Sequence, residues 1–340
     1  MNSELYCKDL IKTLFTNPLK CGADTLYVVS GYATPNMASW LFKYTSNTNS
    51  SINLKLFFGR AMDGISMSIH NGFIQLCKNP FSKSYKSFIC QYIYKNTPIN
   101  ANIYLWFKHD EPYIAFTGSA NFTQKSFSKS QREIMVECDP IIANAFFEQI
   151  EDDSIYCYNS EVEEYITITS YNDMLDKLNN PDVFESNTVR LSLLNSHTGE
   201  THTTSGLNWG HRQNTYNRKD GTISQRQRNP NEAYIPLPKS ISKTGFFPLG
   251  KQHFVVITDD KKQLTLRVEQ QGNKAITTPQ SNAMLGIYFR NRLNLPEGAF
   301  ISRSDLEAYG RTDVTFIKYD EEQFFMDFSP SDSIMGDRLN

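Results

Sequence analysis

The stretch PINANIYLWFKHDEPYIAFTGSANFTQ, from Pro98 to Gln124, constrains the fold of this chain more than any other. Two β-rich apolar runs lie on either side of a polar turn at Lys108 to Pro112, a pattern that predicts two strands joined by a tight connection. The second run ends in Gly-Ser-Ala-Asn, Gly118 to Asn121, which we expect to lead into a helix. A polar loop therefore follows a strand pair that opens with Asn100-Ala101-Asn102.

The first 150 residues alternate between strand and helix patterns, which predicts an α/β fold. Compact β-rich apolar runs predict strands, and apolar residues at helical spacing predict helices. The expected strands are residues 25–32, 52–60, 87–93, 101–107, 113–117 and 133–138, and the expected helices are residues 36–44, 66–77 and 141–150.

The pattern changes in the second half of the chain. Residues 151–187 are acidic and irregular, and the short alternating strands beyond them, separated by Pro and Gly, are typical of a β barrel or sandwich. Because 340 residues are too many for one ordinary core, we expect two domains, residues 1–165 and 188–340, with a linker at 166–187. The expected strands of the second domain are residues 188–194, 253–259, 263–270, 313–320 and 323–328.

Composition excludes several classes of protein. Apolar content is 39%, and no run approaches the roughly eighteen apolar residues of a membrane span. The N-terminal segment MNSELYCKDLIKTLF is amphipathic and carries acidic residues, unlike a secretory leader, so we expect a protein of the bacterial cytoplasm. The six cysteines have no C-x-x-C spacing, which indicates neither a zinc ribbon nor a disulfide framework, and we expect no metal and no cofactor.

The segment from Gly118 to Asn121 offers groups that can converge on an anion. Between a strand and a helix, it supplies the hydroxyl of Ser119, the carboxamide of Asn121 and the backbone amides of a helix N-terminus. An ordinary helix cap is the alternative interpretation, because Ser is common at helix starts. These four residues alone do not decide between the two.

The wider context resembles the phospholipase D superfamily, which places H-x-K on one strand, G-S-x-N after the next strand and an acidic residue further along. Glu133, in REIMVEC, occupies the acidic position. The stretch is particularly similar to NgoFVII-type restriction endonucleases, which read roughly P-I-H-A-K-I-Y-L-W and then A-F-T-G-S-A-N-F-T. In this chain Asn100 and Asn102 stand at the positions of that His and Lys. The hairpin between the strands departs from the spacing in the lipases and resembles an insertion of the nuclease branch.

This resemblance implies phosphodiester hydrolysis without a metal. In such enzymes a neutral histidine attacks phosphorus to form a phosphohistidine, and a second histidine protonates the leaving oxygen. The lysines hold the non-bridging oxygens together with the residues matched here by Ser119 and Asn121, and the glutamate matched by Glu133 fixes the imidazole tautomer. One H-x-K per chain supplies half of this machinery, so the resemblance also implies a homodimer with one composite site.

Asn100 cannot replace that histidine, because its delocalised amide nitrogen neither attacks phosphorus nor cycles a proton near neutral pH. Asn102 is able to donate a hydrogen bond to phosphate but carries no charge. His109, the nearest histidine in the sequence, lacks a lysine two residues on, and we expect it to be a solvated turn residue. We therefore expect a chain that does not cleave. Deliberate inactivation is preferred over natural decay, since such nucleases are toxic to their host.

The C-terminal half, from about Thr188, also resembles this family, whose tail is a pseudobarrel similar to the plant B-three DNA-binding domain. Its clearest markers are SGLNWGHRQ, NEAYIPLP, GKQHFVVITDD and LGIYFRNRLNLPEGAFISRSDLEAYGRTDVTFIKYD. Such folds clasp a duplex between two loops that enter the major groove, where Arg reads guanine and Asn or Gln reads adenine. The N-arm candidate is residues 205–214, and the C-arm candidate is residues 270–278.

The candidate DNA-binding residues lie in polar loops with a local excess of positive charge. Residues 205–230 hold five basic residues against one aspartate, in a chain of net charge −2. Candidates for base contacts are Asn208, Trp209, His211, Arg212 and Gln213 in the N-arm, with Gln271, Asn273 and Lys274 in the C-arm. Candidates for backbone contacts are Arg218, Lys219, Arg226 and Arg228. An ordinary turn and a solvated basic loop are the alternatives, and Arg290 and Arg292 are left open between phosphate contacts and ion pairs.

The leading hypothesis is a Type II restriction endonuclease that binds a short specific site in double-stranded DNA, dimerises through its first domain and, as written, does not cleave. Some relatives also need a helicase-like partner. The alternative is a non-enzymatic, sequence-specific DNA-binding protein on a decayed nuclease scaffold. A lipid phosphodiesterase is disfavoured, because nothing in the sequence resembles a lipid-facing lid.

Overall fold

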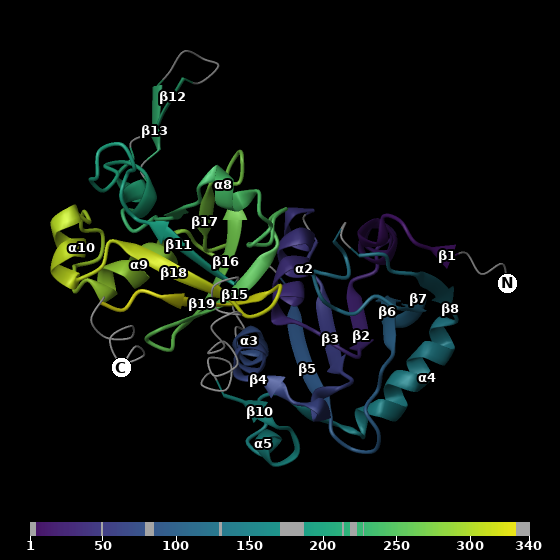
Figure 1. The fold of residues 1–340 in the computed structure, drawn as a ribbon. Coiled ribbons are helices and arrows are strands. Elements are labelled where there is room, and N and C mark those ends of the chain that lie inside the picture. Colours follow the sequence, from purple (N-terminus) through teal and green to yellow (C-terminus); the bar gives the residue numbers. More distant parts are fainter. Residues whose placement is uncertain are drawn as a thin grey trace. The chain divides into compact units, whose positions relative to one another are not determined.

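The structure, a computed structural model, describes residues 5–48, 50–78, 85–128, 131–170, 187–212, 214–217, 223–226 and 228–330. The chain divides into two compact units, residues 1–174 and 175–340. Each unit has a large sheet of its own (Figure 1).

The first unit is built around an eight-stranded mixed sheet. In spatial order its strands are β1 (Leu5–Tyr6), β8 (Met135–Cys138), β7 (Glu111–Gly118), β6 (Asn102–Lys108), β2 (Thr25–Ser30), β3 (Asn53–Phe58), β5 (Ser87–Ile93) and β9 (Ser154–Tyr156). β2, β3 and β5 run parallel, whereas β6 and β7 form an antiparallel hairpin beside β2. All six predicted strands are present. Because β6 is antiparallel to β2, β6 begins at the edge of the sheet where the parallel strands end.

Helices cover both faces of this sheet, which confirms the α/β prediction. α2 (Pro35–Asn47) and α3 (Met67–Cys77) pack on one face, and α4 (Pro140–Glu151) packs on the other. Neighbouring Val28 and Val29 belong to opposite cores, because successive side chains of a strand point to opposite faces. The smaller elements are a π-helix (Lys12–Thr16), α1 (Asn17–Lys20), a 3-10 helix (Ala61–Asp63), β4 (Ile65–Ser66), α5 (Val162–Tyr165) and β10 (Ile168–Thr169).

The segment between the domains is described only at its start. Ile168 and Thr169 of β10, within the predicted linker, pair in parallel with Ile65 and Ser66 of β4. Residues 171–186 lie outside the described residues. The predicted bounds of the two domains and the linker stay predictions.

The second unit is a nearly closed, barrel-like sheet, as the B-three resemblance predicts. Its seven strands, in spatial order, are β11 (Thr188–Ser192), β18 (Asp313–Lys318), β19 (Gln323–Asp327), β15 (His253–Thr258), β16 (Gln263–Glu269), β17 (Ala275–Thr277) and β14 (Ile235–Pro236). The end strands β11 and β14 lie close to each other. A separate ribbon, β12 (Asn214–Asn217) and β13 (Ile223–Arg226), projects away from this sheet (Figure 1). The helices are a 3-10 helix (Gly206–His211), α8 (Lys239–Ser242), α9 (Ala283–Arg292) and α10 (Arg303–Tyr309).

The sequence predicts the long strands of this unit but not the short ones. All five predicted strands are present, whereas β14 and β17, of two and three residues, are too short to carry an alternating pattern. The run IYFRNRL, left open between helix and strand, forms the end of α9. This helix buries residues on most of its sides, so its sequence lacks the polar face that marks a surface helix.

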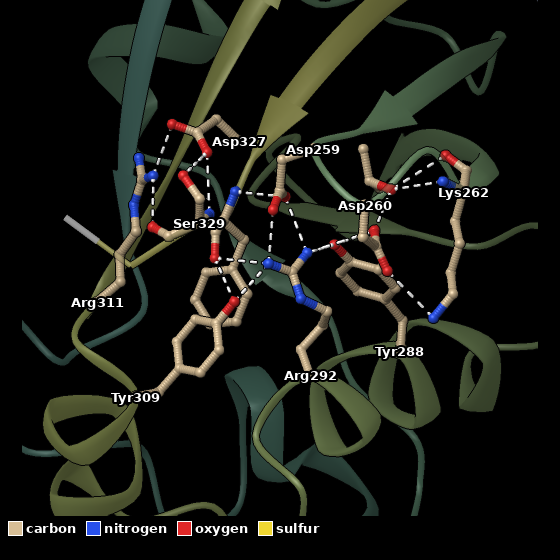
Figure 2. Close-up of polar contacts among 11 residues, drawn as sticks. Asp259, Asp260, Lys262, Tyr288, Arg292, Tyr309, Arg311, Asp327 and Ser329 are labelled. Atoms are coloured by element: carbon tan, nitrogen blue, oxygen red, sulfur yellow. Dashed lines mark hydrogen bonds and ion pairs between the residues drawn. The ribbon is translucent and has the colours of Figure 1, made fainter. Parts of the chain in front are cut away.

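A charged network lies at one end of the barrel-like sheet, and its central pair, Arg292 and Asp259, is mostly shielded from solvent (Figure 2). Arg292 of α9 binds both carboxylate oxygens of Asp259, at 2.9 and 2.6 Å, and also contacts the hydroxyl of Tyr309 and the carbonyl of Phe328. Asp259 in turn accepts a hydrogen bond from the Phe328 amide at 2.9 Å. Burial alone would lower the pKa of Arg292, but the contact with Asp259 outweighs it and raises the pKa. The network thus joins α9 and α10 to the ends of β15 and β19.

Replacing Asp259 with Asn should destabilise the second unit by about 3 kcal/mol, because the buried Arg292 loses its principal counter-charge. Urea unfolding of the full chain measures the change. The matched control is Glu307→Gln, which removes the exposed partner of Arg303 and should cost less than about 1 kcal/mol. Equal losses in the two variants would contradict a buried, structurally important ion pair.

Candidate functional site

The predicted catalytic positions gather where β2 ends and β6 begins. Asn102, which is 8% exposed, accepts hydrogen bonds at Oδ1 from Ser30 Oγ (2.8 Å) and the Gly31 amide (3.3 Å). Its Nδ2 group donates to the carbonyl oxygens of Gly118 (3.2 Å) and Ser119 (3.1 Å). Asn102 therefore joins β2 to the loop that follows β7.

This position corrects one expectation. The sequence left Asn102 able to donate a hydrogen bond to phosphate, but both of its N–H groups are used by backbone carbonyls. In this chain Asn102 is a structural amide.

Asn121 is held at the same edge. Its Oδ1 accepts from the Tyr32 amide at 3.0 Å and lies 3.4 Å from Ser30 Oγ. Because Oδ1 accepts from these donors, Asn121 can meet an anion only through its Nδ2 group. Ser30 Oγ also accepts a hydrogen bond from the Phe122 amide at 2.8 Å. This one hydroxyl therefore contacts both the start of β6 and the segment after β7. Ser30 is not among the residues predicted from the sequence. Its position at the carboxyl end of a parallel strand, where ligand sites of α/β folds commonly lie, could have indicated it from the sequence.

Ser119 and Glu133 form a direct pair. The Ser119 hydroxyl donates to the Glu133 carboxylate and accepts from the Ile134 amide at 3.0 Å. Ser119 is exposed and Glu133 is partly exposed. The Glu133 carboxylate therefore fixes the direction of the Ser119 hydroxyl on the exposed side of the site.

Asn100 completes the group and is exposed. Its Oδ1 lies 2.8 Å from the place that a Cβ on residue 31 would take, and Asn121 Oδ1 lies 3.5 Å from the same point. Glycine at position 31 thus allows Asn100 to approach the turn after β2. All five predicted positions are brought to one edge of the sheet, although their catalytic roles stay a prediction.

The helix expected after Asn121 is wrong for the described residues. Residues 123–128 form turns, closed by hydrogen bonds such as Phe127 N to Gln124 O at 3.2 Å. The Thr123 hydroxyl contacts the Ser126 hydroxyl at 3.1 Å and accepts from the Ser126 amide at 3.3 Å. Short hydroxyl side chains that bond to the local backbone favour turns over a helix. Among the described residues, the segment after Asn121 therefore supplies no helix N-terminus to this site.

His109 lies in the turn between β6 and β7, at the opposite end of β6 from Asn102. It is exposed, and both His109 and Asp110 have positive φ angles, 55° and 63°, as a two-residue hairpin of the primed type requires. The prediction of a solvated turn residue is confirmed.

The N-arm candidate of the second unit is a tightly held loop. Asn208 is fully buried; its Nδ2 donates to the carbonyls of His202 (3.0 Å) and Ile301 (2.8 Å), and its Oδ1 accepts from the Ile301 amide (2.9 Å). These contacts fix the loop within the domain. A base contact by Asn208 has no support in this geometry.

The other N-arm candidates have varied surroundings. Trp209 packs edge-on against Tyr234, and the Arg228 guanidinium lies 4.3 Å from its ring centroid. Arg228 also pairs with Glu232 at 2.6 Å, which offsets part of its charge. His211 contacts the ring of Phe300, whereas Arg212 is exposed. The predictions for Gln213, Arg218 and Lys219 lie outside the described residues, and of Arg226 only the backbone, in β13, is described.

The C-arm candidate, residues 270–278, covers the turn that joins β16 to β17 and the buried strand β17 itself. Gln271 and Lys274 are exposed, and Asn273 is partly exposed. Gln270, Gly272 and Asn273 have φ angles of 67°, 81° and 54°, so the turn has a defined left-handed backbone. This geometry presents polar side chains to solvent.

Neither Arg290 nor Arg292 is placed to contact phosphate, because partners within the second unit hold both guanidinium groups. Arg292 is paired with Asp259. Arg290 is fully buried and donates to the carbonyls of Ala299 (2.8 Å), Gly286 (3.2 Å) and Pro230 (3.3 Å), and burial lowers its pKa. The alternatives weighed for Arg290 were a phosphate contact and an acidic partner, and the structure gives it backbone carbonyls instead.

Comparisons with known proteins agree with this division of the chain. Residues 8–164 match the family model of the NgoFVII restriction endonuclease N-terminal PLD domain, and residues 183–320 match that of the NgoFVII C-terminal B3-like DNA-binding domain. Together these define a phospholipase D-like nuclease domain joined to a B-three-like DNA-binding domain. The chain belongs to the NgoFVII restriction endonuclease family.

Solved structures give fold-level similarities to about half of the chain. NucT from Helicobacter pylori is 12% identical, over 46% of this chain and 98% of that chain, with a TM-score of 0.31. Nuc from Salmonella typhimurium, described as a phospholipase D family member, is 12% identical over 47% and 99%, with a TM-score of 0.32. Polyphosphate kinase from Porphyromonas gingivalis is 13% identical over 47% and 26%, with a TM-score of 0.29. The family models, and not these low scores, carry the assignment.

No curated protein matches the chain. In the part of the chain that the structure describes, no helix has the length and apolar character needed to cross a membrane.

Replacing Asn208 with Ala should lower the stability of the second unit by about 2 kcal/mol, because the backbone of Ile301 loses buried hydrogen bonds. Urea unfolding of the full chain measures the loss. Gln271→Ala, in the exposed C-arm turn, is the control and should change stability by less than about 0.5 kcal/mol. An Asn208→Ala chain of unchanged stability and weakened DNA binding would instead restore Asn208 to the base contacts.

Proposed function

We propose that this chain is a Type II restriction endonuclease by descent, which binds a short specific duplex site as a homodimer and does not cleave it. The observation that carries the proposal is the gathering of Asn100, Ser119, Asn121 and Glu133 around the turn after β2. The resemblance to the superfamily motif implies such a cluster, with amides at the positions of the reactive His and Lys.

In a family member with His at position 100, that residue would form a phosphorus–nitrogen bond and displace the leaving oxygen, without need of a metal. The N–H groups of Asn121 would donate to the non-bridging oxygens as negative charge builds, and the Ser119 hydroxyl would have to give up its hydrogen bond to Glu133 to join them. The amide of Asn100 supplies no nucleophile, so binding without bond cleavage is the expected outcome here.

Exposed apolar side chains beside the site support a homodimer. Tyr32 follows Gly31 and is 49% exposed, and Ile134 follows Glu133 and is 47% exposed. Apolar surface next to a half-site is suited to a two-fold interface that brings the second half-site into place. The proposed partners are therefore duplex DNA and a second copy of this chain. A helicase-like partner and a cytoplasmic location stay predictions from the sequence.

A second candidate function is a non-enzymatic DNA-binding protein on a decayed nuclease scaffold. The hydrogen bonds of Asn102 favour this second candidate. Its amide donates to the backbone carbonyls of Gly118 and Ser119, which contributes to folding and requires no role in chemistry. Restoring the reactive groups separates the two candidates.

The double variant Asn100→His/Asn102→Lys should cleave duplex DNA in the presence of a chelator, because it regains a nucleophile and a cation at one edge of the sheet. Plasmid digestion with excess EDTA is the measurement, and the unmodified chain and each single variant are the controls. Circular dichroism checks folding, since the Asn102→Lys change gives up the two hydrogen bonds that the amide donates. A folded double variant that leaves all plasmids intact would favour the non-enzymatic protein.

The unmodified chain should bind a selected duplex more tightly than unrelated duplexes, with an affinity that falls steeply as salt rises. Each Lys or Arg contact to a phosphate contributes a slope of about −0.9 to the log–log plot of affinity against salt. Arg212→Ala should reduce the slope by about that amount, whereas Lys20→Ala, on the first unit, should leave it unchanged. An electrophoretic shift with no preference among duplexes would refute the recognition half of the proposal.

A further inference from the structure

Arg60 lies at the same edge as the candidate site, although the sequence motif does not include it. It follows β3, and its amide donates to the Gly31 carbonyl at 3.2 Å. Gly59 accepts from the Ile99 amide at 2.9 Å, and a Cβ on residue 59 would lie 2.2 Å from the Ile99 carbonyl oxygen. Glycine at position 59 therefore permits the segment that leads to Asn100 to pass directly beside Arg60.

The Arg60 side chain is held in place by two neighbours. Its Nε and one terminal nitrogen each lie 2.6 Å from a carboxylate oxygen of Asp63, and its guanidinium lies 5.7 Å from the centroid of the Tyr32 ring. The Tyr32 amide is the group that binds Asn121 Oδ1. Asn121, Tyr32 and Arg60 thus form one connected series of contacts, and about one third of the Arg60 side chain remains exposed.

A phosphodiester at this edge would meet mainly uncharged donors. Ser119, Asn121 and Asn100 are neutral, Glu133 is an acceptor that takes the Ser119 hydrogen, and the family's lysine position is occupied by an amide. A guanidinium has five N–H donors in a planar fork, and Asp63 occupies one side of that fork. The remaining side has the geometry that binds two phosphate oxygens together.

We propose that Arg60, positioned by Asp63 and Tyr32, binds the phosphodiester that occupies the candidate site and supplies its positive charge. This inference rests on the proposed function, because it assigns a further binding residue to the same site. A purely structural role is the competing explanation, since an exposed ion pair three residues apart and a cation–π contact are common on protein surfaces.

The test measures binding of a fluorescein-labelled single-stranded oligothymidylate of about 12 nucleotides, a length within the span of single-strand sites. Fluorescence anisotropy follows the full chain over a range of salt concentrations. Arg60→Ala should weaken binding by roughly tenfold, because it removes a charged donor. The log–log salt slope should also fall by about 0.7, the value for one phosphate contact on a single strand.

Two further variants separate phosphate binding from a structural role. Asp63→Asn releases the guanidinium from its ion pair, so it should bind the oligothymidylate at least as tightly as the unmodified chain. A structural role predicts that Asp63→Asn weakens binding as Arg60→Ala does. Arg303→Ala is the matched control, because Arg303 also forms an exposed ion pair at 2.6 Å but lies in the other unit.

The inference is overturned if Arg60→Ala binds like the unmodified chain, if Arg303→Ala loses as much affinity, or if the unmodified chain does not bind the oligothymidylate. It is also overturned if Arg60→Ala changes only the sedimentation coefficient, which would place Arg60 in a subunit interface. Failure of the proposed function is seen separately, as a loss of discrimination among duplexes by the unmodified chain.

Discussion

The candidate site depends on the hydrogen bonds of the Ser30 hydroxyl. This buried group donates to Asn102 and accepts from the amide of Phe122, so it ties the end of β2 to the start of β6 and to the loop after β7. A buried hydroxyl without partners is costly, which favours a single arrangement of these three segments. The position of Asn121, through the neighbouring Tyr32 amide, follows from that arrangement.

The same contacts explain how Asn102 fits into the fold at this edge. An amide both donates and accepts, so Asn102 satisfies a hydroxyl on one side and two carbonyls on the other. The oxygen and the nitrogen of the Asn102 carboxamide therefore both have hydrogen-bond partners.

Much of the fold is predictable from local patterns, and much of the site is not. Strands such as β2 and β3 are long apolar runs, and the spacing of Asn100, Ser119 and Glu133 locates one edge of the sheet. Long-range partners decide the remainder. Asn208 is buried by the backbone of Ile301, which lies 93 residues away in the chain, and no local pattern carries that information. The turns after Asn121 depend on side-chain hydrogen bonds that compete with a helix.

Arg290 has a consequence for how recognition can change in this family. Its buried guanidinium holds the carbonyl of Pro230, two residues after Arg228 and close in sequence to the ribbon of β12 and β13, and also that of Ala299, close to Ile301. Arg290 of α9 therefore holds the segments beside the N-arm candidate in place from within the domain, although α9 contains none of the candidate base-contact residues. A substitution of Arg290 would therefore change the support of this loop and leave the loop's own side chains the same.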